Sequence, residues 1–218
     1  MELEAAYSLH ANAQKAEKMA AYMKNNFPFL GIMKTDRAAL TKEMLKVCRT
    51  ASPEITQAGI TILWQKPERE YHYFAIEWAR SAKAHKWNNA YDLIVLLTVQ
   101  NQWWDSVDTV AAHLTGPWAK LYPEKALIER EKWLTSPNMW WRRTAIIYQL
   151  NHKKETDTLF LEKAIEQLHY EKEFFIRKAI GWALRQYART DADWVMEICN
   201  KYPLSGLSRR EALKHLGN

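Results

Sequence analysis

Apolar residues recur every three or four positions along most of the chain, with Lys, Glu and Gln between them, as in amphipathic helices. This spacing predicts a first helix over residues 2–26. Further helix starts are indicated where a capping side chain or a proline opens an apolar-periodic run. They lie at Asp36, Ser52-Pro53, Lys66-Pro67, Tyr122-Pro123, Ser136-Pro137 and Thr190-Asp191. Because no convincing period-two strand intervenes, we predict an all-α protein in which Asp36 caps the second helix.

A repeat of about 35 residues organises the later part of the chain. Aromatic residues followed by an apolar stretch open helix pairs that we expect to start near Arg69, Trp103, Met139 and Phe174. Helix pairs of this period stack into a solenoid, and the absence of the tetratricopeptide consensus favours the HEAT-like type. We therefore predict a right-handed α-solenoid (superhelix) with a concave groove. It forms a single domain over residues 1–218, with N-terminal helices in 1–65 and helix-pair repeats in 66–218.

The repeat register brings particular side chains together. Steps of about 35 residues from Tyr73 reach Asp108, Arg143 and Lys178, which we expect at one level on the concave face. Such a row combines one carboxylate with two cations, and a row of charged residues is not expected in a core.

Two tryptophans are tied to this row by helical geometry. Trp104 lies one turn before Asp108, and Trp182 lies one turn after Lys178. The alternative is that both indoles belong to the core and the charges to a solvated face, since aromatic residues at helical spacing are usually buried. The chain has 11 Trp, more than a core needs, and this favours a wall on which both indoles face a ligand.

Composition limits which binding partners and which kinds of catalytic site we expect. The 31 Lys and Arg outnumber the 25 Asp and Glu, and a net charge of +6 favours a polyanion, nucleic acid above all. The seven histidines form no metal-binding motif, and Cys48 and Cys199 match no metal or disulfide spacing, so we expect no metal and no cofactor. A reducing cytoplasm suits two such cysteines. Neither a signal peptide nor a membrane-spanning run is recognisable.

Several segments, in order along nearly the whole chain, resemble the AlkD family of alkylpurine DNA glycosylases. They are YMKNNFPFLGI at 22–32, WWDSVD at 103–108, WWRRTAIIYQL at 140–150, EFFIRKAIGWALRQYA at 173–188 and LSRREALKH at 207–215. Residues 50–100 carry the least of this resemblance.

The resemblance implies a HEAT-like solenoid that grips duplex DNA and hydrolyses the N-glycosidic bond of N3- and N7-alkylated purines. The family's catalytic aspartate falls on Asp108, its two cleft tryptophans on Trp104 and Trp182, and its phosphate-contacting arginine on Arg143. A helix tyrosine of the family falls on Tyr22, which we take as a DNA-binding candidate.

Lys178 and Arg185 complete the DNA-binding candidates. The resemblance also implies that the target base stays stacked in the duplex, so that no base-shaped pocket is needed. The expected partner is double-stranded DNA carrying alkylated purines, and the expected state is a monomer.

The alternative hypothesis is a non-catalytic protein. A HEAT-like scaffold binds DNA shape or a protein partner through the same groove, and a solenoid fold alone does not distinguish the two. Asp108 favours the enzyme, because a carboxylate in a DNA-facing groove repels phosphate and serves a pure binder poorly.

Overall fold

The computed structural model describes residues 2–216, and all regular structure in this range is helical. The chain divides into two compact units, Met1–Leu93 and Ile94–Asn218. The boundary falls inside the helix α6. The single domain, with a change from N-terminal helices to helix pairs after residue 65, stays a prediction. No helix between residues 2 and 216 is long and apolar enough to cross a membrane.

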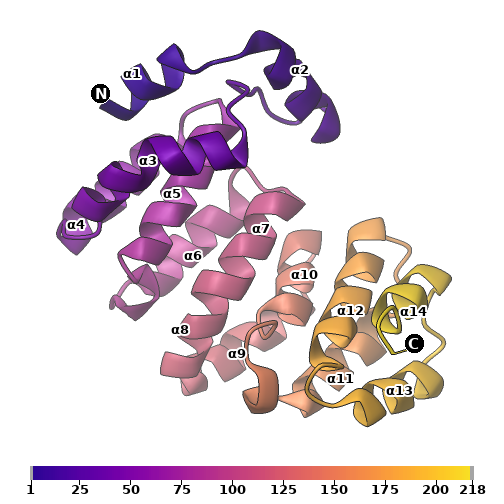
Figure 1. Ribbon diagram of the computed structural model, residues 1–218. Coiled ribbons are helices and arrows are strands. Elements are labelled where there is room, and N and C mark those ends of the chain that lie inside the picture. Colours follow the sequence, from indigo (N-terminus) through magenta and orange to yellow (C-terminus); the bar gives the residue numbers. More distant parts are fainter. Residues whose placement is uncertain (1, 217–218) are drawn as a thin grey trace. The chain divides into compact units, whose positions relative to one another are not determined.

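The first unit contains the helices before α6. They are α1 (Glu2–Leu9), α2 (Ala13–Tyr22), α3 (Lys34–Cys48), α4 (Pro53–Trp64) and α5 (Arg69–Ser81), with a 3₁₀ turn at Ala84–Lys86. The helix α6 (Ala90–Val99) spans the boundary between the units. Figure 1 shows these elements from indigo to magenta.

The expected single helix over residues 2–26 is wrong, because the chain breaks between α1 and α2. Asn12 causes the break by acting as a cap. Its side-chain oxygen accepts a hydrogen bond from the N–H of Lys15 at 2.9 Å, as an N-cap does. Its own N–H donates to the carbonyl of Leu30 at 2.8 Å, which ties the break to a distant loop.

The predicted start of the next helix is also corrected. The helix α3 begins at Lys34, and Asp36 lies in its first turn instead of capping it. A carboxylate there still favours the positive end of the helix dipole, which explains the misleading signal. The start at Ser52 is confirmed: its hydroxyl accepts from the N–H of Ile55 and Pro53 occupies the first turn of α4.

The second unit continues with paired helices. They are α7 (Trp104–Val110), α8 (Gly116–Leu121), α9 (Pro123–Leu134), α10 (Met139–Ile147), α11 (Thr158–Leu168), α12 (Phe174–Tyr187), α13 (Ala192–Lys201) and α14 (Gly206–Ala212). In Figure 1 α7, α10 and α12 lie side by side, and α10 contacts both of the others. The second helices α9 and α11 pack against α10.

The helix starts confirm the repeat. Three first helices begin at Trp104, Met139 and Phe174, 35 residues apart, and α5 begins at Arg69, another 35 residues earlier. Helix pairs that stack on their neighbours in chain order confirm the predicted all-α solenoid. Its handedness and its concave groove stay predictions.

The repeated aromatic residues open the helices for a structural reason. The rings of Trp103, Trp140 and Phe175, one from each of three successive repeats, have centroids 5.1–5.6 Å apart. This cluster fixes the starts of α7, α10 and α12 against one another, because aromatic pairs at this distance add to the burial they provide. These positions therefore build the fold through contacts between repeats. Trp104 and Trp182 are half-buried, as are Trp103 and Phe175 of the cluster.

Candidate functional site

An interrupted helix carries Asp108. A π-helical turn at Ala111–Thr115 joins α7 to α8, and Pro117 follows it. A proline has no N–H, so the α-helical bond to the carbonyl of His113 cannot form, and a wider turn accommodates the gap. The side-chain amide of Asn151 donates to the carbonyl of Ala112 at 3.0 Å and so satisfies part of the widened turn.

The widened turn is also held from the next repeat. A Cβ atom on Gly116 would lie 2.2 Å from the carbonyl oxygen of Tyr148, so only glycine lets the end of α10 pack this closely. The imidazole of His152 lies 3.3 Å from the carbonyl of Gly116. The helix that presents Asp108 is therefore fixed by contacts from the segment after α10.

Asp108 and Arg143 form a buried, two-pronged ion pair. The Nε and Nη2 atoms of Arg143 donate to Oδ1 and Oδ2 of Asp108, both at 2.7 Å. Nη1 of Arg143 donates to the carbonyl of Phe175 on α12. The two side chains are only 5% and 14% exposed for Arg143 and Asp108, respectively. This contact confirms the predicted register between α7 and α10.

Opposing influences act on the ionisation of Asp108. Burial raises the pKa of its carboxyl above the ordinary value, and the nearby charge of Asp105 acts in the same direction. The Arg143 guanidinium opposes this shift through its charge and its hydrogen bonds. Because an arginine does not lose its proton, the bidentate geometry favours the ionised carboxylate.

Asp108 lies on the wall of a pocket, which we call the aspartate pocket. Its lining combines α7 and the π turn with the segment after α10 and with α12: Asp108, Thr109, Ala112, His113, Leu150, Asn151, Trp182 and Gln186. The predicted Trp182 is thus brought to Asp108. Trp104 is half-buried one turn earlier on α7 and is not part of this lining.

The predicted cations of α12 share one carboxylate. Lys178 lies 2.9 Å from Glu211 of α14, and Arg185 pairs with the other oxygen of the same residue. These two bonds are the main reason that the pKa of Glu211 is lowered. A Cβ atom on Gly181 would lie 2.5 Å from Cβ of Glu211 and 2.8 Å from the carbonyl of Ser208, so glycine lets α14 approach α12.

Tyr22 and Tyr73 belong to the first unit. Tyr22 is 69% exposed at the end of α2 and lines a mostly apolar pocket with Tyr73, Lys15 and Lys18. The guanidinium of Arg37 lies 4.5 Å from the ring centre of Tyr73, a cation–π distance. The place of Tyr73 in the predicted row and the role of Tyr22 in DNA binding stay predictions.

Sequence reasoning missed the polar partners of this site. His113, Asn151 and Gln186 line the aspartate pocket, and Glu211 holds two predicted cations. Pro117 is a sequence signal for the irregular turn that carries His113. Glu211 lay inside the segment 207–215 that carries the resemblance, but no repeat partner marked it. Within residues 2–216 no group of three or more His, Cys, Asp or Glu side chains could hold a metal ion.

Comparison with known proteins gives the family of the chain. The sequence pattern of the family described as DNA alkylation repair enzyme matches residues 3–216, including the stretch 50–100. A solved structure described as a predicted DNA alkylation repair enzyme from Enterococcus faecalis is 37% identical, with a TM-score of 0.87. The match covers 95% of this chain and 97% of that one. A search of curated proteins found no match. The chain belongs to the DNA alkylation repair enzyme family.

Proposed function

We propose that this protein is a DNA glycosylase that hydrolyses the N-glycosidic bond of cationic N3- and N7-alkylated purines in duplex DNA, without flipping the base. The observation that carries the proposal is Asp108, which Arg143 holds in a buried ion pair and which lines a pocket together with Trp182. A carboxylate held in fixed geometry at a pocket wall is the group that this reaction requires.

The chemistry needs little acid catalysis. Alkylation at N3 or N7 makes the purine cationic, so it departs as a neutral base and positive charge develops on the deoxyribose. A preorganised negative charge stabilises such an oxocarbenium-like transition state, and an acceptor oxygen orients the attacking water. Asp108 supplies both when its carboxyl is ionised.

Arg143 and the indoles support this role. The arginine fixes both oxygens of Asp108, so the carboxylate does not reorganise during the reaction. We further propose that Arg143 contacts a phosphate through the second N–H of Nη1 or Nη2, since each atom uses only one N–H for Phe175 or Asp108. Trp182, and Trp104 on the same helix as Asp108, offer ring faces that attract positive charge on the sugar.

DNA binding falls to the cations and to the exposed tyrosine. Lys178 and Arg185 are candidates for backbone contacts, and Tyr22 is the candidate in the first unit. Such contacts position the duplex without reading its sequence. We also propose that the protein acts as a monomer in the cytoplasm, where its two free cysteines would stay reduced.

The test incubates the protein with a duplex methylated at purines and separates the released bases by chromatography. Release of 3-methyladenine or 7-methylguanine, with abasic sites left in the strand, is the expected result. Tight binding of the same duplex without base release would contradict the proposal. That outcome would instead favour the non-catalytic scaffold that binds DNA shape.

A further inference from the structure

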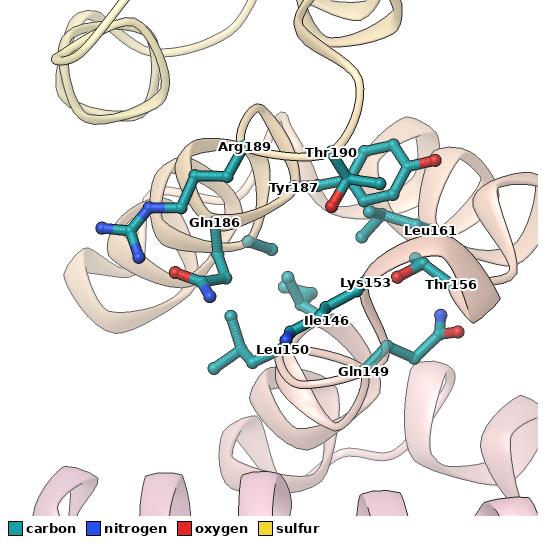
Figure 2. A pocket seen from close by; sticks show the side chains of 11 residues that line it. Ile146, Gln149, Leu150, Lys153, Thr156, Leu161, Gln186, Tyr187, Arg189 and Thr190 are labelled. Carbon is teal, nitrogen blue, oxygen red and sulfur yellow. The ribbon is translucent and has the colours of Figure 1, made fainter.

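A second pocket adjoins the aspartate pocket, and we call it the 146–190 pocket after the first and last of its lining residues. The two share Leu150 and Gln186 in their walls. Gln186 lines the 146–190 pocket from the end of α12, Arg189 from the turn that follows α12, and Lys153 from the segment after α10 (Figure 2). A group bound in this pocket would therefore lie next to whatever occupies the site of Asp108.

The charge of the 146–190 pocket is uncompensated. Two cations, Lys153 and Arg189, line it, and no Asp or Glu does. Both side chains are exposed, and neither makes an ion pair with any residue in 2–216. In contrast, Lys178 and Arg185 on the helix α12 already share Glu211. An anion from outside the protein is the partner that this pocket lacks.

The segment that carries Lys153 is held in place. The side chain of Gln149 bonds to both backbone groups of Asp157, accepting from its N–H at 2.8 Å and donating to its carbonyl at 3.3 Å. Lys153 itself has a left-handed backbone with φ of 54°, which is unfavourable for a lysine and persists only where the surroundings impose it. The cation is therefore presented by a defined turn.

The size and lining indicate more than a bare anion. The pocket encloses about 310 Å³, and Ile146, Leu161 and Ala183 give it an apolar floor. The side chains of Gln186 and Thr190 offer hydrogen-bonding groups with no partner in residues 2–216. A phosphodiester with its attached sugar matches this combination of cations, polar groups and apolar surface.

We propose that the 146–190 pocket binds a backbone phosphodiester of the lesion-carrying strand, with its phosphate between Lys153 and Arg189 and the adjoining deoxyribose on the apolar floor. The inference rests on the proposed function, because it takes the lesion's own sugar to lie at Asp108. The shared wall at Gln186 then places the neighbouring sugar-phosphate in the 146–190 pocket.

The first experiment measures affinity for an unmodified duplex as a function of NaCl. The plot of log K against log salt has a negative slope. The double variant Lys153→Gln/Arg189→Gln should make this slope less steep by about 0.9, the value for one phosphate contact. At 0.1 M NaCl this corresponds to about eightfold weaker binding. The control Lys154→Gln/Lys172→Gln removes the same charge from exposed positions outside the pocket. An equal effect of both double variants would overturn the proposal.

The second experiment locates the phosphate. A duplex with a stable abasic analogue is made with a neutral methylphosphonate at one flanking position of the same strand. The wild-type protein should lose about eightfold in affinity from one such replacement. The double variant should lose nothing further, because its contact is already gone. A methylphosphonate effect that is undiminished in the double variant would overturn the assignment.

Two further results separate this inference from others. Saturable binding of adenosine monophosphate that the double variant loses, with duplex affinity unchanged, would assign the pocket to a free nucleotide and overturn the DNA contact. Wild-type excision of 7-methylguanine is measured on the same preparation. If excision is present but the double variant binds DNA like the control, only the phosphate site fails. If excision is absent, the proposed function fails, whatever the binding data show.

Discussion

Replacing Asp108 by Asn should cost stability as well as activity, because the ion pair with Arg143 is buried. The change keeps the shape of the side chain but removes the charge that faces a guanidinium only 5% exposed. Breaking a buried pair by removing one partner costs about 3–5 kcal/mol. Burial raises the pKa of Asp108, so the fold tolerates a neutral side chain there better than the ion pair alone would indicate, and the Asn oxygen still accepts one hydrogen bond. We therefore expect a loss of about 3 kcal/mol, near the lower end of that range. For a chain of this size that is a decrease in Tm of about 6–12 °C.

Urea unfolding followed by circular dichroism measures this loss, and a surface pair provides the control. Glu131→Gln breaks the pair with Lys163, whose side chains are 45% and 43% exposed, and should cost less than about 1 kcal/mol. The double variant Asp108→Asn/Arg143→Gln should lose less than the sum of its single variants, because the two residues are coupled. If Asp108→Asn is as stable as Glu131→Gln, the interpretation of a desolvated, energetically coupled pair is refuted.

Three further predictions concern charge and packing. Burial raises the pKa of Asp108, and the reaction needs its carboxylate, so excision should fall as the pH drops through that raised pKa. Because the charge of Asp105 also raises this pKa, Asp105→Asn should move the acid limb of the pH–rate profile to lower pH. An acid limb that does not move would contradict the electrostatic assignment. Glu211→Gln releases Lys178 and Arg185 from their shared carboxylate. Duplex affinity should therefore rise several-fold at low salt, and the gain should vanish at high salt. A gain in affinity that does not depend on salt would argue against a phosphate contact. Gly181→Ala forces α14 away from α12 and should cost about 1–3 kcal/mol in urea unfolding. Gly206→Ala, whose Cβ would meet only the end of Arg210 at 3.4 Å, should cost clearly less, and equal losses would refute the packing argument.

The sequence predicted the helix pairs and one decisive contact. A repeat of fixed length places equivalent positions at one level, so stepping from Asp108 to Arg143 identified two residues that bond directly. The same reasoning assumed that a row of charged residues stays outside the core, and this was wrong for Arg143. Its burial is possible because Asp108 and the carbonyl of Phe175 satisfy the guanidinium.

What could not be predicted lies outside the periodic pattern. The break between α1 and α2 at Asn12 depends on a hydrogen bond to Leu30, which is distant in the sequence. The spacing of apolar residues near Asn12 does not indicate this contact. Asn151 and Glu211 reach the site from a connecting segment and from a short terminal helix, where no repeat register applies. Periodicity therefore determined the scaffold and its paired charges, whereas the polar surroundings depend on how irregular segments pack.

The most direct test of the account is the single-turnover rate of 7-methylguanine release by Asp108→Asn, measured at saturating protein and beside Asp105→Asn. The fixed carboxylate is proposed to stabilise the positively charged sugar, so its loss should lower the rate by at least about 10²-fold. Asp105→Asn should stay near the wild-type rate at neutral pH, because Asp105 lies outside the aspartate pocket. A folded, DNA-bound Asp108→Asn protein that releases 7-methylguanine at nearly the wild-type rate would contradict the central claim.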